Sequence, residues 1–140
     1  MKKITLVAVM IMLLTTFYSC GNTEKILVRK DGNWNIDEYT TTTDFGGVND
    51  TEVHENYGTC TFKDDGTGTI QYSDGSPDDS FTWSVNEDIV TVTFAAIGEA
   101  IDFDVIESTR TSQHWKGSYT IDVLGVPVTT QIDFSLSFMD

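Results

Sequence analysis

The stretch from Gly58 to Phe94 most constrains the fold, because apolar and polar residues alternate along nearly all of it. A period of two is typical of β-strands that have one face in the core and one in water. Short runs of turn-forming residues, such as Asp64-Asp65-Gly66 and Asn86-Glu87-Asp88, interrupt the alternation. Tight turns of this kind join antiparallel neighbours. The stretch therefore predicts four strands in an up-and-down meander.

The same alternation continues on both sides of this stretch and predicts four further strands. Within the second strand the inward-facing parity changes near Gly58, and a bulge at this glycine is a natural way to switch faces. Residues 44–52, DFGGVNDTE, are predicted to form a loop, because glycine, aspartate and asparagine favour turns. The predicted strands are 33–42, 53–63, 67–73, 80–86, 89–96, 100–107, 112–123 and 128–139.

Eight strands joined by short connections indicate an all-β fold in which the two outer strands need protection. We expect an eight-stranded antiparallel up-and-down meander that closes into a barrel, since closure removes the sheet edges. A β-sandwich of two packed sheets is the alternative. The interior of an eight-stranded barrel is just wide enough to be filled by side chains or to hold one small ligand. Polar outward residues such as Asp102 and Asp104 exclude a barrel that spans the outer membrane.

Residues 1–19 are predicted to be a secretory signal peptide that takes no part in the fold. Lys2 and Lys3 give it a positive start, and residues 6–14 form an apolar run. That run is too short to be a typical membrane span. The small residue Ser19 stands at the expected cleavage point.

Ser19-Cys20-Gly21 resembles the lipobox of bacterial lipoproteins, in which the cysteine becomes acylated, for example with palmitate, after the signal is removed. The resemblance implies a membrane anchor on Cys20 and a place in the cell envelope, and Gly21 after the cysteine points to the outer membrane. Two or three acyl chains make an effectively permanent anchor. A plain secretory signal followed by a structural cysteine is the alternative. We expect residues 20–31 to form a tether and residues 32–140 to form one barrel domain.

The charge of the chain is strongly one-sided. Without Lys2 and Lys3, six basic residues face 22 acidic ones, a net charge of −16. This excludes nucleic acid as a partner, because the phosphate backbone requires a basic surface. The acidic surface serves solubility or, alternatively, forms a recognition patch. With Cys20 acylated, Cys60 is the remaining cysteine and is predicted to be a buried free thiol rather than a nucleophile.

Gly32-Asn33-Trp34 at the start of the first strand resembles the G-x-W motif of lipocalins. Residues 62–68, FKDDGTG, followed by a strand with Trp83, are similar to a pattern in the lipocalin-like domains of Gram-negative lipoproteins. The resemblance covers residues 32–139 and implies an eight-stranded meander barrel, often with an unknown ligand. It also implies that Trp34 packs at the base of the barrel.

Eleven aromatic residues share the inward parity of the predicted strands, and they either line a cavity or fill the core. Two functions follow from these alternatives. The protein is either a carrier of a small apolar ligand or a filled barrel that binds a protein partner in the envelope through its acidic rim. Besides Phe81 and Phe138, the inward aromatics are the candidate cavity-lining residues Trp34, Phe62, Tyr72, Trp83, Phe94, Phe103, Trp115, Tyr119 and Phe134.

No catalytic constellation and no metal site is predicted. His54 and His114 lie outside any spacing typical of metal ligands and are expected at the surface. Acidic pairs such as Asp102 and Asp104 lie in turns or on exposed faces, where a raised pKa is not expected. Residues 74–79 hold several aspartates but lack the EF-hand spacing of a calcium site. We therefore expect a monomeric protein that is not an enzyme and has no cofactor.

Overall fold

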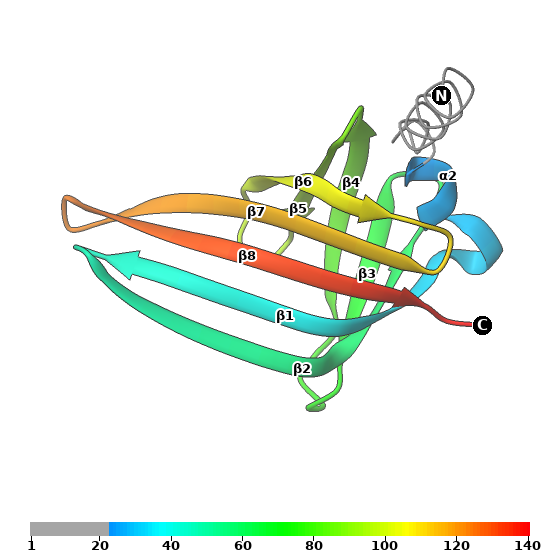
Figure 1. Cartoon of the computed structure of the whole chain (residues 1–140), viewed down its shortest axis with the longest axis horizontal. Coiled ribbons are helices and arrows are strands. Elements are labelled where there is room, and N and C mark those ends of the chain that lie inside the picture. Colours follow the sequence, from blue (N-terminus) through cyan, green and yellow to red (C-terminus); the bar gives the residue numbers. More distant parts are fainter. Residues whose placement is uncertain (1–22) are drawn as a thin grey trace, which may run out of the picture.

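The computed structural model describes residues 23–140. The predicted signal peptide, Cys20 and the first residues of the expected tether lie outside the described residues. Two short helices precede a run of eight strands, which Figure 1 shows in chain order. The elements are α2 (Thr23–Leu27), η3 (Arg29–Gly32), β1 (Asn33–Phe45), β2 (Val48–Phe62), β3 (Thr67–Tyr72), β4 (Asp79–Asn86), β5 (Ile89–Phe94), β6 (Ala100–Ser108), β7 (Ser112–Val123) and β8 (Val126–Phe138).

The strands form a closed barrel in which each pairs antiparallel with the next and β8 pairs with β1. The predicted all-β meander barrel is confirmed, and the alternative sandwich is not formed. The six strands β3 to β8 begin and end within two residues of their predicted bounds. Their boundaries were predictable because clear turn formers interrupt a strict alternation.

The predicted loop at residues 44–52 is wrong. β1 runs to Phe45 and β2 begins at Val48, so only Gly46 and Gly47 turn the chain. Both glycines have positive φ, 61° and 88°, as a tight two-residue hairpin turn requires. The Gly47 amide donates a hydrogen bond to the Asp44 carboxylate at 2.8 Å. The other turn-forming residues of this segment lie within the two strands of a long hairpin and do not end them.

The predicted bulge in the second strand is present. Ile36 pairs with Gly58 and Glu38 pairs with Glu55, so β2 holds one residue more than β1 between these pairs. Gly58 lies tightly against β3, where a Cβ atom would sit 2.1 Å from the Gln71 carbonyl oxygen. The expected switch of faces in β2 is wrong, because Cys60 and Phe62 before the bulge and Glu52 beyond it all face inward. The inward parity changes in β1 instead, between Ile36 and Tyr39.

The expected tether is wrong for residues 23–31, which fold against one end of the barrel, here called the base. Leu27 is fully buried, and its carbonyl accepts a hydrogen bond from the Trp34 indole at 3.0 Å. The Thr23 hydroxyl donates to the Ser108 hydroxyl at 3.1 Å. Of the charged side chains in this segment, Arg29 packs its guanidinium over the Phe138 ring at 3.8 Å. The others are exposed, which leaves the one leucine free to close the base. Trp34 is also fully buried there, as the resemblance implied.

At the other end, four strands continue beyond the barrel. β2 pairs with β3 only from Gly58 onward, and β7 pairs with β6 only as far as Gly117. Past these points β2, β1, β8 and β7 form a four-stranded sheet made of residues 38–56 and 118–132, here called the extension. Figure 1 shows its two hairpin tips side by side, at the end of the molecule opposite α2. Among residues 23–140 no helix is long and apolar enough to cross a membrane.

Candidate functional site: the inner face of the extension

The barrel half of the molecule is filled with side chains. Its core cluster runs from Leu27 and Trp34 at the base to Phe134 near the mouth. An interior cavity of about 20 Å³ remains, which is room for about one water molecule. Ligand pockets usually measure about 300–1,000 Å³.

The nine candidate cavity-lining residues fall into two groups. Trp34, Tyr72, Trp83 and Tyr119 do not touch this cavity. The other five do line it, but as close-packed rings: four of them form a chain with centroids 5.7 to 6.3 Å apart, and Phe94 packs on Phe81 at 6.1 Å. These five are Phe62, Phe94, Phe103, Trp115 and Phe134.

Missing side chains at inward glycines do not open the core. A Cβ atom at Gly68 would lie 2.2 Å from the Phe81 ring, and one at Gly117 would lie 2.8 Å from the Phe103 ring. The space left by each glycine is therefore occupied by a neighbouring phenyl ring. A large ring thus lies opposite each residue that lacks a side chain, which keeps the interior close-packed.

All four tyrosines of the described residues gather at the mouth, where the barrel passes into the extension. Tyr39 stacks on Tyr57 at 4.8 Å and packs against Phe134 at 4.8 Å. Tyr57 meets Tyr72 edge to face at 5.4 Å. Burial, followed by the neighbouring Tyr57 and Tyr119, raises the pKa of Tyr39 to about 12. This tyrosine cluster closes the barrel at the mouth with rings packed on rings.

Beyond the cluster, the strand register arranges the inner face of the extension in rows. Directly paired residues in an antiparallel sheet point to the same side. One row near the tips is apolar: Val48 pairs with Phe45, Phe45 with Val128, and Val128 with Ile121. Val48 is 72% exposed and Phe45 is 54% exposed. Ile121 is 44% exposed, whereas Val128, between Phe45 and Ile121, is buried. Because large apolar side chains in contact with one another are normally covered, the three exposed members of this row indicate a contact surface.

The rows nearer the mouth are polar on the β2 side. Asp50 lies beside Thr43 and Glu52 lies beside Thr41. These four residues, with Phe45 and Val48, line an open hollow of about 530 Å³. The extension carries six acidic residues and no lysine or arginine. Two of these acids, Asp50 and Glu52, lie on the inner face, where the His54 ring is 3.6 Å from the Glu52 carboxylate. The surface therefore combines an apolar row with an excess of negative charge.

Both outer edges of the extension are unpaired. Residues 48–56 of β2 have β1 on one side and no strand on the other, and residues 118–123 of β7 have only β8. Exposed edges present free N–H and C=O groups that can pair with another chain. The barrel half has no such edge, because each strand there has two neighbours.

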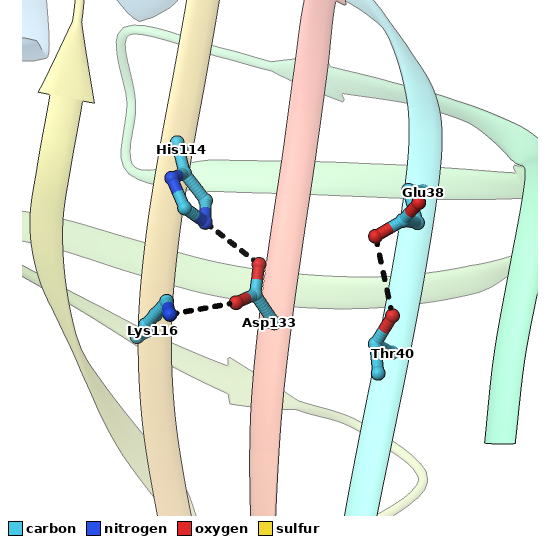
Figure 2. Close-up of polar contacts among 5 residues, drawn as sticks. All are labelled: Glu38, Thr40, His114, Lys116 and Asp133. Atoms are coloured by element: carbon cyan, nitrogen blue, oxygen red, sulfur yellow. Dashed lines mark hydrogen bonds and ion pairs between the residues drawn. The ribbon is translucent and has the colours of Figure 1, made fainter. Parts of the chain in front are cut away.

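The outer face carries an ionic cluster instead of an apolar row. Asp133 accepts from the His114 ring at 2.7 Å and from the Lys116 ammonium at 3.2 Å, as Figure 2 shows. On the same face Thr40 donates to Glu38 at 3.3 Å. His114 is thus partly covered by an ion pair, where we expected an ordinary surface residue. Its contacts are those of a structural cluster.

The remaining chemical candidates also have structural roles. Asp65 accepts from the Thr67 hydroxyl and then from its backbone N–H, and Asp74 accepts from the Ser76 backbone N–H, each within its own turn. These hydrogen bonds lower the pKa of both carboxyls. Burial raises the pKa of the Cys60 thiol, in agreement with a buried free cysteine. Within residues 23–140 no group of three or more His, Cys, Asp or Glu side chains could hold a metal ion.

A comparison with protein families finds a match to the lipocalin-like domain over residues 31–115. The chain belongs to the lipocalin-like family. Its closed eight-stranded meander agrees with this assignment. Lipocalin-like proteins are generally binding proteins rather than enzymes. No curated protein and no solved structure matches the chain.

In this lipocalin-like chain the inner face of the extension was missed by sequence reasoning, apart from Tyr119. The signal was faint but present. Phe45 and Val48 are bulky apolar residues within a Gly-Asp-Asn segment, where a solvated loop needs neither. The four residues Phe45, Val48, Ile121 and Val128 come from two hairpins that are far apart in sequence, and only the β1–β8 pairing joins them.

Proposed function

We propose that this lipocalin-like protein is lipid-anchored in the cell envelope and binds another protein through the inner face of the extension. The observation that carries the proposal is the contrast between a core with about 20 Å³ of free space and an apolar row across four strands, of which Phe45, Val48 and Ile121 are exposed. A barrel without a ligand-sized cavity does not suit the transport of an apolar molecule in its interior. An exposed apolar row beside charged residues suits a protein interface.

The proposed anchor fits the direction in which the molecule presents this surface. Two residues separate Cys20 from the first residue of the base helix α2 in the sequence, and the tips of the extension lie at the end opposite α2 (Figure 1). A lipid on Cys20 would hold the base near the membrane, which we propose is the outer membrane. The extension would then point away from that membrane, toward partners in the adjoining space.

The anchor can be tested on the full chain expressed in its native host. We expect incorporation of labelled palmitate into the wild type and recovery of the protein with the membranes. Cys20→Ala should abolish both, whereas Cys60→Ala should keep the label, because the Cys60 thiol is buried. A label that survives Cys20→Ala would contradict lipidation at this residue.

The docking surface can be tested by placing a photo-crosslinking amino acid at Ile121, on the inner face, and at Thr120, on the outer face of the same strand. We expect one discrete cross-linked protein from position 121 in intact cells and none from position 120. Equal products from both positions, or no product from either, would contradict the proposal. Native mass spectrometry of the purified domain should give the bare mass, and a bound small molecule released on denaturation would favour the carrier function.

A further inference from the structure

We infer that the partner adds to the free edge of β2 as an extended strand that carries basic and apolar side chains. The inference rests on the proposed docking function and specifies its geometry. Its basis is the coincidence, on residues 48–56, of an unpaired edge, an adjacent open hollow and three acidic residues with no lysine or arginine.

The edge itself is suited to strand addition. Residues 48–56 pair with β1 along one side, and β3 pairs with β2 only from Gly58. Proteins usually protect an exposed edge with lysine, proline or a short strand. This edge has neither lysine nor proline and is nine residues long. An extended peptide can therefore gain main-chain hydrogen bonds along its whole length, with side chains providing specificity.

The side chains beside the edge define the chemistry of the partner. On the inner face of β2 the order from the tip is Val48, Asp50 and Glu52. A strand pairing with β2 places its own inner-face residues directly opposite these three. It should therefore present one apolar residue opposite Val48 and basic residues opposite Asp50 and Glu52. The hollow of about 530 Å³ next to these residues gives long side chains room to lie against Thr41 and Thr43.

Charge also decides against a second copy of this chain as the occupant. The extension has no lysine or arginine, so the β2 edge of one molecule would face acidic residues of another without compensation. Opposed like charges destabilise strand pairs and are a common means of excluding wrong partners. The free edge of β7 is shorter and holds a single acid, Asp122. Of the two free edges, the β2 edge is thus the one whose acidic side chains favour a basic partner.

The probe is a synthetic peptide of alternating inner-face and outer-face residues, with Val, Lys and Lys on the inner positions and Thr elsewhere. Binding to the purified domain is measured by calorimetry, and hydrogen exchange reports the protected amides. We expect saturable binding that weakens with salt, together with slower exchange at residues 48–56 and unchanged exchange at residues 118–123. A peptide with Glu in place of Lys should not bind.

Two pairs of variants make the test specific. Asp50→Asn with Glu52→Gln should weaken binding of the lysine peptide about tenfold or more, while Asp122→Asn on β7 should leave it unchanged. Of two peptides N-methylated on alternate residues, only the one whose methyl groups point at β2 should lose binding. The other keeps its free N–H groups toward the edge and should bind like the parent.

The outcomes separate this inference from the proposed function. Absence of peptide binding, equal binding of both N-methylated peptides, or protection at residues 118–123 would overturn strand addition at β2, even if position 121 cross-links to a partner. Loss of the cross-link with retained peptide binding would overturn the cellular docking function instead. Dimers of the domain alone, protected at residues 48–56, would overturn the choice of a basic partner.

Discussion

β1, β2, β7 and β8 behave differently in the two halves of the molecule. In the barrel half their inner side chains, such as Trp34 and Trp115, lie against aromatic rings from other strands and are buried. In the extension the same strands have inner side chains, such as Phe45 and Val48, that meet solvent. The backbone pairing is continuous through both halves. What changes is the presence of strands on the opposite wall, which end at the mouth.

The difference shows that pairing and packing have separate roles in this chain. The barrel half derives its stability from buried apolar area, and the extension relies on backbone hydrogen bonds with little core of its own. Residues can therefore be changed in the extension at little cost to the fold, which is a useful property for a surface that recognises a partner. The predictions below test this division, beginning with the largest expected effect.

Trp34→Ala should destabilise the protein most. The substitution empties a fully buried site and leaves the Leu27 carbonyl without its indole donor, so we expect a loss of about 3–5 kcal/mol in the free energy of unfolding. Denaturant unfolding followed by tryptophan fluorescence measures it. Phe45→Ala in the extension is the matched aromatic control and should cost less than about 1 kcal/mol. Equal costs at the two sites would remove the distinction between the halves.

Leu27→Ala tests whether the base segment belongs to the barrel half. Leu27 is fully buried against the core, so its truncation should lower the free energy of unfolding by about 2–5 kcal/mol. Lys25→Ala, on the solvent side of the same short helix, should change it by less than about 0.5 kcal/mol. A stability unchanged by Leu27→Ala would mean that residues 23–31 act as a tether after all. Urea titrations of both variants decide the matter.

Tyr39→Phe tests the boundary between the halves through pH. The pKa of Tyr39 is about 12 in the folded protein against about 10 in an unfolded chain, so between these values the unfolded state holds fewer protons. Stability should therefore be complete below about pH 10 and fall as the pH rises toward 12. In the variant, the free energy of unfolding should fall less between pH 10 and 12. Its absorbance titration should lack the tyrosinate that forms at the highest pH. Thr40→Ala, at the next outward position, should retain both features.

Lys116→Gln should have the smallest effect. The Lys116 ammonium and Asp133 form an ion pair at 3.2 Å on the outer face, with the lysine side chain 55% exposed. Such pairs contribute about 0–1 kcal/mol and are screened by salt. We expect a change in this range in thermal unfolding at low ionic strength, and a smaller one at high salt. A larger loss would show that the outer face stabilises the extension.

The sequence predicted the strands of the barrel half and both strands of the β7–β8 hairpin well, but the β1–β2 hairpin of the extension poorly, for one physical reason. Alternation is visible only where one face is buried, as for Ile101 and Phe103 between exposed aspartates. In residues 44–52 neither face of the sheet is buried, so the sequence shows no alternation of apolar and polar residues there. Gly46 and Gly47 then suggested a loop. The base helix was missed because it is only five residues long and buries just Thr23 and Leu27.

The candidate site was predictable only in fragments. Tyr72, Tyr119 and Phe134 were expected to face inward, and they do lie at or near the mouth. Their gathering with Tyr39 and Tyr57 depends on the irregular pairing of β1 and β2 at this point, where the inward parity of β1 changes between Ile36 and Tyr39. The location of a bulge to within one or two residues depends on packing against β3, and this is a contact between strands that a linear pattern does not contain.

The pairing of β1 with β8 has a consequence for how the chain acquires its structure. These strands are the first and the last, and every residue between them must be in place before the ring can close. Contacts between distant parts of a sequence slow folding, because a long stretch of disordered chain must be brought together first. The barrel therefore cannot close stepwise while the segments of the chain are still being delivered. It forms only once the final strand is present. Until then the edges of the first seven strands are open to pairing with other chains, and either chaperones or rapid closure must prevent this.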